Sequence, residues 1–275
     1  MVIDAHQHFW VYDGERDAWI TEEMSVIRRN FFPENLIPLL AENNIGGCVA
    51  VQAAQSESET EFLLQLAEAN DFIKGVVGWT DLRSPDLYDR LDFYAQYEKL
   101  SGFRHIVQAE SDDFLTRPDF INGVKALHAF DFTYDILIYP TQLEAALYFV
   151  RQMPEMKLVI DHLAKPYIKS GEIEAWARSM KTLAAFPNVF CKVSGMVTEA
   201  DWKNWKKEDF APYLDVVFEE FGCERLMYGS DWPVCLVAGE YKDQKSILDN
   251  YLFSYTEEQK AMVMGGNAIR FYNLS

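Results

Sequence analysis

The sequence predicts one α/β domain, residues 1–275, that closes into a (β/α)8 barrel, also called a TIM barrel. Short runs rich in Val, Ile, Phe and Tyr alternate eight times with segments of helical period, and several runs are apolar on both faces. Strands of that kind are typical of a parallel sheet covered by helices. Eight such units fit the ~250 residues that this barrel needs.

The expected strands are bounded by Gly, Pro, Asn and Asp residues. They cover residues 2–8, 46–53, 73–80, 102–107, 133–139, 157–162, 188–194 and 225–230. The structural alternative is an open, doubly wound sheet. No Gly-x-Gly-x-x-Gly follows any of these runs, and Gly46-Gly47 stands at the start of one, so the barrel is favoured.

The expected helices lie between the strands and begin at recognisable signals. Three of them have a proline at the front, and Thr256 with Gln259 forms a capping box before the last. They are expected over residues 34–43, 59–69, 86–100, 119–129, 142–153, 172–185 and 208–221, and from residue 257 on.

Composition excludes several classes of partner. The chain has 25 Lys and Arg against 43 Asp and Glu, a net charge of -18 at pH 7. This charge repels phosphate backbones and anionic lipid surfaces, so neither nucleic acid nor a membrane is expected as a partner. Neither a membrane span nor a signal peptide is visible, and the four cysteines form no Cys-x-x-Cys pair. We expect a cytoplasmic protein, either a monomer or a homodimer.

Histidines and an aspartate stand where the chemistry of such a barrel is expected, at the carboxyl ends of the strands. The first strand ends in His6-Gln7-His8, and residues two apart in a strand point to the same side. His162 ends the sixth strand, and Asp231 follows the eighth. Imidazole groups are good zinc ligands, so His6 and His8 are candidate metal ligands, and Asp231 is a candidate metal ligand or general base. The structural alternatives are that His162 is a buried histidine without a catalytic role and that Asp231 ends the strand in a turn.

Other polar and aromatic side chains are expected near the same rim. Candidate substrate-binding residues are Arg104, Trp10, Trp232, Lys192 and Tyr139. Two alternatives stay open: Lys192 holds an internal carboxylate, and the aromatic side chains pack in the core. The long segment 9–32 after the first strand, with Trp19 and Arg28, is a candidate lid.

Several longer stretches resemble the sugar-lactonase branch of the amidohydrolase superfamily. They are residues 4–10 (DAHQHFW), 75–81 (GVVGWTD), 102–108 (GFRHIVQ), 161–166 (DHLAKP), 192–195 (KVSG), 229–233 (GSDWP) and 266–272 (GNAIRFY). This branch includes L-rhamnono- and L-fucono-lactonases and is related to 2-pyrone-4,6-dicarboxylate lactonase. The resemblance covers essentially the whole chain and implies a hydrolase that opens a sugar-acid lactone to the hydroxy acid.

The resemblance also implies catalytic roles. Asp231 would take a proton from the attacking water, and His162 would steer that water. His105 and Arg104, at the end of the fourth strand, would bind substrate oxygens or stabilise the oxyanion.

The metal content follows from a departure from the family pattern. Many two-metal members carry a Lys after strand 4 and a His after strand 5, whereas this chain offers His105 and no His in residues 133–139. We therefore expect at most one divalent ion, held by His6, His8, His162 and Asp231, with zinc the first choice. Metal-independent hydrolysis, known for some relatives, stays open.

Two other functions remain as alternatives. One is a metal-dependent, non-oxidative decarboxylase of the same superfamily, and the other is a catalytically inactive, sugar-binding barrel. The sequences of residues 102–105 and 161–166 favour the lactonase branch over the decarboxylase. The histidines and the aspartate at the rim argue against an inactive barrel.

Overall fold

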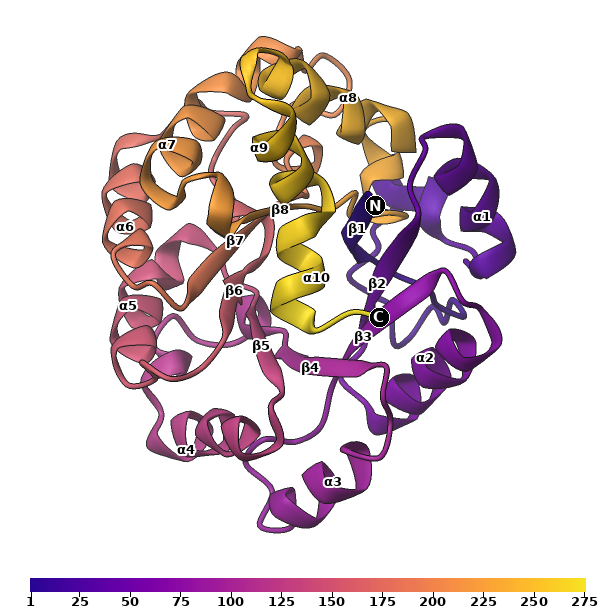
Figure 1. The fold of residues 1–275 in the computed structure, drawn as a ribbon, viewed down its shortest axis with the longest axis vertical. Coiled ribbons are helices and arrows are strands. Elements are labelled where there is room, and N and C mark those ends of the chain that lie inside the picture. Colours follow the sequence, from indigo (N-terminus) through magenta and orange to yellow (C-terminus); the bar gives the residue numbers. More distant parts are fainter.

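The computed structural model describes all residues 1–275 and contains eight parallel strands in the order β1 to β8. They are β1 Ile3–Gln7, β2 Gly47–Val51, β3 Ile73–Gly78, β4 Leu100–His105, β5 Thr133–Ile136, β6 Leu158–Ile160, β7 Val189–Val193 and β8 Leu226–Tyr228. Helices surround this sheet on its outside (Figure 1). The predicted (β/α)8 barrel is confirmed.

Hydrogen bonds at one end join the first strand to the segment after the last. The amide of His8 donates to the carbonyl oxygen of Trp232 at 2.7 Å, and the amide of Asp231 donates to that of His6 at 2.8 Å. Gln7 and Trp232 form a parallel bridge. These bonds close the barrel, because they place β1 beside the segment that follows β8.

Ten α-helices accompany the strands. They are α1 Pro33–Glu42, α2 Glu57–Ala69, α3 Leu87–Tyr94, α4 Pro118–Ala126, α5 Leu143–Arg151, α6 Glu174–Ala184, α7 Ala211–Phe221, α8 Tyr241–Tyr251, α9 Glu257–Ala261 and α10 Asn267–Tyr272. None of them combines the length and the apolar character that a bilayer crossing requires.

One helix prediction was wrong, and one helix was not predicted. The helix expected over 86–100 ends at Tyr94, and Leu100 already begins β4. No helix was expected over α8, in which four residues are buried: Tyr241, Gln244, Ile247 and Leu248. Because one of these four is polar and the rest of α8 is polar too, its apolar period is weak.

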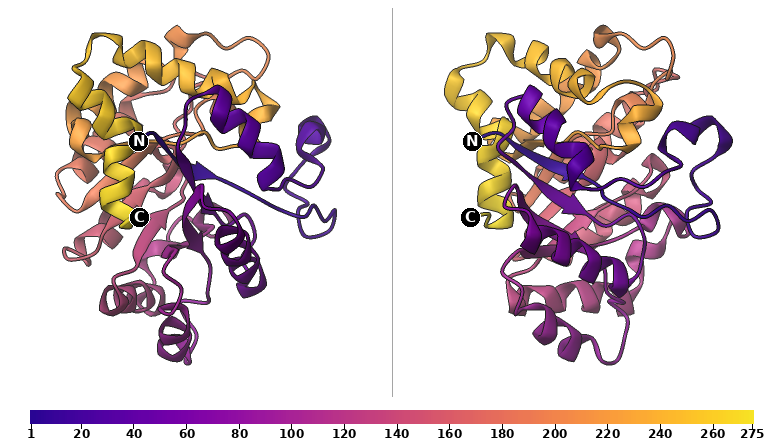
Figure 2. Two further views of the ribbon diagram at one scale, coloured as in Figure 1. Left: turned by 45° about the vertical axis from the view of Figure 1, so that its right-hand side comes forward. Right: turned by 90° about the vertical axis from the view of Figure 1, so that its right-hand side faces the viewer.

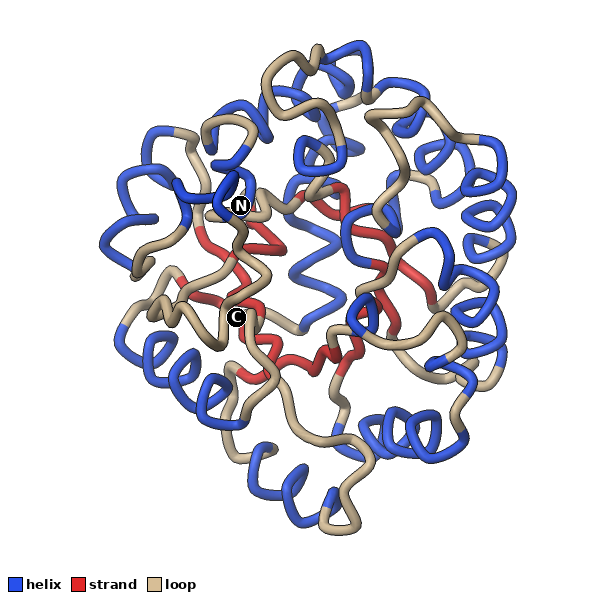
Figure 3. The backbone as a smooth tube through the Cα atoms, turned by 180° about the vertical axis from the view of Figure 1, so that it is seen from behind, coloured by secondary structure: helices blue, strands red, loops and turns tan.

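Helix α10 closes the end of the barrel where the strands begin. In Figure 1 it crosses in front of the sheet, and from behind it is seen through the ring of strands (Figure 3). Ala268, Phe271 and Tyr272 pack there against barrel residues such as Ile3 and Val49. The opposite end, where the strands finish, is therefore the one free to hold a site.

The segment between β1 and α1 extends beyond that opposite end. Figure 2 shows it as the indigo loops that project from the barrel. Backbone hydrogen bonds between Trp10 and Phe31 pin its two ends together, and a short 3-10 helix, Glu22–Ile27, lies within it.

Candidate active site

Two histidines from the first strand meet at the barrel mouth. His6 lies in β1 and His8 directly follows it, so the alternation of side chains puts both on one side. Their Nε2 atoms are 3.2 Å apart, and both side chains are buried. His8 Nδ1 lies 2.7 Å from the carbonyl oxygen of Val51, so this nitrogen carries the proton. The lone pair of His8 Nε2 therefore points into the site.

Asp231 follows β8 in the left-handed backbone region, with a φ of 56°. Its Oδ1 atom is 3.4 Å from His8 Nε2 and 3.8 Å from His162 Nε2. Burial by itself favours the neutral acid, but His162, His8 and Lys165 outweigh it and lower the pKa of Asp231. Asp231 is thus an ionised carboxylate at neutral pH, ready to accept a proton.

His162 opens a left-handed turn that runs through Lys165, with φ values between 50° and 56°. Each L-residue in this conformation costs roughly 1–2 kcal/mol, so such a turn is rare. His162 Nδ1 lies 2.9 Å from Ser194 Oγ, and a Cβ at Gly195 would come within 2.6 Å of the same nitrogen. Burial lowers the pKa of His162 to about 4, so the ring is neutral at physiological pH.

The donor atoms fit one divalent metal ion. His6 Nε2, His8 Nε2 and Asp231 Oδ1 all lie within 4.8 Å of one another. Their separations are 3.2, 3.4 and 3.9 Å; the first two are close to the edges of a tetrahedron around an ion with bonds of ~2.0–2.2 Å, and the third is longer. Burial lowers the pKa of His6 well below its usual value, which keeps this ligand unprotonated. The carbonyl behind His8 orients its ring as outer partners do in metal sites.

A buried network of alternating charges lies beneath the histidines. Lys192 Nζ is 2.5 Å from Asp135 Oδ2 and 3.0 Å from Asp161 Oδ1. Arg104 Nη1 is 3.0 Å from Asp161 Oδ2, and the hydroxyl of Tyr272 donates to Asp135 Oδ2 at 2.8 Å. Burial disfavours the charged form of Asp161, but Lys192, His6 and Arg104 hold its pKa well below the usual range. The network therefore carries two carboxylates and two cations inside the barrel.

This network supports His6 from behind. His6 Nδ1 lies 3.1 Å from Lys192 Nζ and 3.3 Å from Asp161 Oδ1, so a donor and an acceptor both face it. Lys192 is fully buried and does not line the cavity described next. Of the two interpretations of Lys192, the geometry matches the lysine that holds internal carboxylates.

A cavity of about 250 Å³ opens above these groups. Its lining combines acid–base groups, aromatic rings, small apolar side chains and amides: His8, Trp10, Trp19, Ala53, Gln55, Arg104, Ile106, Gln108, Ala109, Leu137, His162, Lys165, Asp231 and Val234. Trp19 comes from the candidate lid and meets Trp10 edge to face, with ring centroids 6.2 Å apart. A cavity of this kind, with few convergent polar groups, suits a small polar ligand that has an apolar side.

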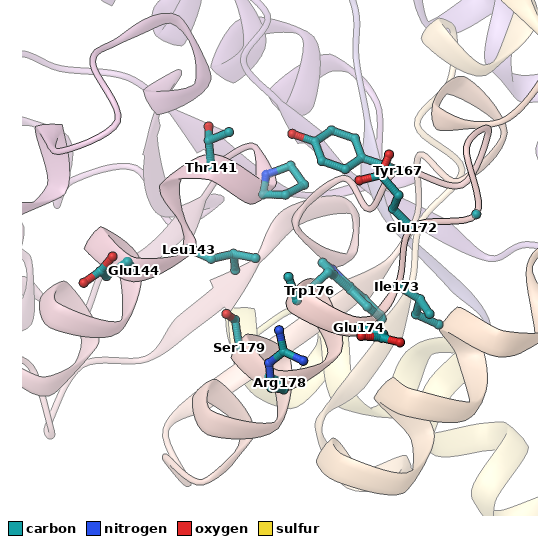
Figure 4. A pocket seen from close by; sticks show the side chains of 13 residues that line it. Thr141, Leu143, Glu144, Tyr167, Glu172, Ile173, Glu174, Trp176, Arg178 and Ser179 are labelled. Carbon is teal, nitrogen blue, oxygen red and sulfur yellow. The ribbon is translucent and has the colours of Figure 1, made fainter.

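A larger hollow of about 730 Å³ lies elsewhere, around the start of α5 and the start of α6. Figure 4 shows Tyr167, Trp176 and Arg178 among its lining side chains. It contains none of the histidines and neither Asp231 nor Arg104. Although this hollow is larger, it is therefore not the candidate active site.

The structure separates some of the predicted site residues from the cavity. His105 is next to Arg104 in β4, so the two side chains point to opposite faces. Arg104 lines the cavity, whereas His105 stacks on Phe114 and its Nε2 lies 2.9 Å from Glu110 Oε1. This placement corrects the expectation that both residues face the substrate.

Two aromatic predictions need the same correction. Trp232 is buried against Phe9 and Phe31, and it does not line the cavity. Tyr139 lies outside the lining as well, with its ring 5.4 Å from Lys165 Nζ. Of the three aromatic residues predicted to bind substrate, Trp10 alone is in the lining.

Sequence reasoning missed three polar side chains of the cavity: Gln55, Gln108 and Lys165. Gln55 Oε1 accepts the amide of Ile106 at 2.8 Å, while Gln108 Oε1 is buried without a protein partner. Lys165 stands inside one of the stretches that carry the family resemblance, which was the available signal. The left-handed turn that directs it inward has no mark in the sequence.

Comparison with known proteins shows the family to which the chain belongs. The chain matches the amidohydrolase family model over residues 3–274. It is 39% identical to an L-fucono-1,5-lactonase of Burkholderia multivorans over 284 residues, which cover 99% of this chain and 96% of that protein.

Two crystal structures of an amidohydrolase from the same organism superpose closely. They contain bound HEPES and bound zinc, with TM-scores of 0.96 and 0.95, 39% identity and full coverage of both chains. The resemblance inferred from the motifs is confirmed, and the chain belongs to the amidohydrolase family.

Proposed function

We propose that the protein hydrolyses a sugar-acid lactone, with L-fucono-1,5-lactone or a close analogue as its substrate. The observation that carries the proposal is the ionised Asp231, which lines the cavity beside His8 and His162. Relatives named for this activity match the chain over 99% of its length. The apolar part of the lining, from Ala109, Leu137 and Val234, suits the methyl group of a 6-deoxy sugar acid.

Asp231 is the general base of the proposed reaction. It accepts a proton from a water molecule whose oxygen attacks the lactone carbonyl carbon. The resulting tetrahedral oxyanion then collapses, the bond to the ring oxygen breaks, and Asp231 returns the proton to that oxygen. A positioned base of this kind contributes typically ~10²–10⁴-fold.

His162 and Arg104 orient the reacting groups. Neutral His162 lies 3.8 Å from Asp231 Oδ1 and is placed to hold the attacking water. Arg104, fixed by Asp161 at 3.0 Å, supplies positive charge beside the cavity. The rings of Trp10 and Trp19 form an apolar wall on which a sugar face can stack.

His6, His8, His162 and Asp231 are the residues that would hold a metal ion, and zinc is the proposed one. When bound, a divalent ion polarises a carbonyl oxygen and lowers the pKa of water. Hydrolysis of an activated ester ring also proceeds with general-base help alone, so chelation separates the two cases.

The test is a hydrolysis assay with a pH indicator on aldono-1,4- and 1,5-lactones that include the L-fucono, L-rhamnono and L-galactono compounds. We expect turnover above the spontaneous rate, with the L-fucono compound preferred. A parallel series after chelation shows whether the ion is required. Absence of turnover on every lactone, together with carbon dioxide release from an aromatic acid, would overturn the proposal in favour of the decarboxylase.

A further inference from the structure

The left-handed turn after β6 delivers two side chains to the cavity. Its backbone is closed by a hydrogen bond from the amide of Lys165 to the carbonyl oxygen of His162 at 2.7 Å. In a turn with three residues per revolution, side chains three apart lie on the same face. His162 and Lys165 are three apart, and both line the cavity. The costly backbone conformation therefore places Lys165 as well as His162.

The ammonium of Lys165 has an incomplete set of partners. Glu199 is its single salt-bridge partner, 3.3 Å away, and the ring of Tyr139 lies 5.4 Å from Nζ. An ammonium has three N–H donors, and one carboxylate takes one or two of them. The side chain is 17% exposed, so at least one donor remains for a ligand in the cavity.

The other cation of the cavity is already engaged. Arg104 Nη1 is 3.0 Å from Asp161, and Nη2 donates to the carbonyl oxygen of Gln52. Its Nε is buried and has no partner. The Arg104 side chain is only 3% exposed, against 17% for Lys165, so Lys165 is the cavity cation that a ligand reaches more readily.

The proposed reaction creates a need for such a cation. Ring opening converts a neutral lactone into a carboxylate beside the ionised Asp231, and two like charges repel each other in a site of low dielectric constant. An ammonium within reach of the new carboxylate offsets this repulsion.

We propose that Lys165 contacts the substrate, binding the carboxylate of the ring-opened acid and the carbonyl oxygen from which it forms. This inference rests on the lactonase function proposed above. It assigns the site a ligand class, the monocarboxylate sugar acids, and Glu199 a positioning role for Lys165.

The experiment compares the binding of L-fuconate with that of its neutral analogue, L-fuconamide, by calorimetry. The main variant is Lys165→Asn, because asparagine tolerates the left-handed conformation and so preserves the turn. We expect it to lose about tenfold or more in affinity for L-fuconate, with little change for L-fuconamide. Lys169→Asn, on the same loop but outside the cavity, is the control of equal charge and should bind both compounds like the wild type.

A second variant distinguishes direct ligand binding by Lys165 from a purely structural pairing of Lys165 with Glu199. Glu199→Gln removes the negative charge but keeps an acceptor oxygen that can position the ammonium, so it should bind L-fuconate at least as tightly as the wild type. If Lys165 serves only to hold Glu199, both variants should change binding in the same direction. That result, or an unchanged preference for the anion in Lys165→Asn, overturns the inference while lactone turnover by the wild type stands. A wild type that neither hydrolyses the lactones nor binds the two ligands overturns both proposals.

Discussion

At the scale of single residues, the site depends on histidines that stay neutral because they are buried. Burial lowers the pKa of His162 to about 4 from the usual 6.5, and burial also lowers the pKa of His6 well below its usual value. Neutral rings leave lone pairs for a metal ion or a water molecule beside the carboxylate of Asp231. Proton uptake by these rings is therefore coupled to unfolding.

His162 makes stability depend on pH in a defined direction. In the unfolded chain its ring takes up a proton near pH 6.5, but in the folded protein only near pH 4. The unfolded state thus binds more protons between these values, and stability falls as the pH falls through this window, by about 3 kcal/mol for this group. Urea unfolding at several pH values should show a shallower loss in His162→Gln. His128→Gln, which removes an exposed histidine, should keep the wild-type slope; equal slopes in all three proteins would contradict the account.

Lys192 has a structural role by its contacts, and its removal is a test of that role. Lys192→Met leaves Asp135 and Asp161 buried with one cation fewer, which should lower the free energy of unfolding by about 3–5 kcal/mol. The double variant Lys192→Met/Asp135→Asn removes one of the stranded charges and should recover part of the loss. A raised KM with unchanged stability would instead make Lys192 a substrate ligand.

At the scale of elements, the loop after β6 packs closely against the loop after β7, and the contact is between His162 and Gly195. Gly195 has a φ of 62°, and a Cβ there would meet His162 Nδ1 at 2.6 Å. Gly171 has a similar φ of 75° but open space around it. The two glycines therefore separate the cost of the backbone conformation from the cost of the contact.

Gly171→Ala should lower stability by about 1 kcal/mol through its left-handed backbone and leave activity unchanged. Gly195→Ala should lower stability further and reduce kcat, because His162 must move. Thermal unfolding and steady-state kinetics on both variants check this. Equal losses in both proteins would show that the contact with His162 has no role.

Much of this architecture was predictable from short-range patterns, and the failures have physical causes. Runs of β-branched residues marked all eight strands, and parity along β1 correctly put His6 and His8 on one side. The same argument puts Arg104 and His105 on opposite faces of β4, because successive side chains in a strand point to opposite faces. Lys165 could not be found this way, because a left-handed turn of ordinary L-residues depends on tertiary contacts and leaves no pattern in the sequence.

At the scale of the whole molecule, the site joins the beginning of the barrel to its end. His6 and His8 come from β1, whereas Asp231 follows β8, and backbone hydrogen bonds connect the two segments. Any ligand that bridges these residues also ties the barrel closed. The opposite end is closed separately by α10, whose Tyr272 reaches the buried network.

A metal ion bound between β1 and the segment after β8 should stabilise the entire fold. An ion present at 100 times its Kd raises the free energy of unfolding by about 2.7 kcal/mol when it binds the folded state alone. Zinc added back to chelated protein should therefore raise the Tm, and His8→Ala should abolish most of the increase. An equal increase in His8→Ala would place zinc binding elsewhere on the protein.

The most direct test of the central claim is the kcat/KM for L-fucono-1,5-lactone of the wild type and of Asp231→Asn. The amide keeps the shape of the side chain but cannot accept the proton of water. We predict a loss of about 10²–10⁴-fold, with Asp71→Asn, an exposed aspartate, matching the wild type. An Asp231→Asn protein that is folded and as active as the wild type would contradict the account.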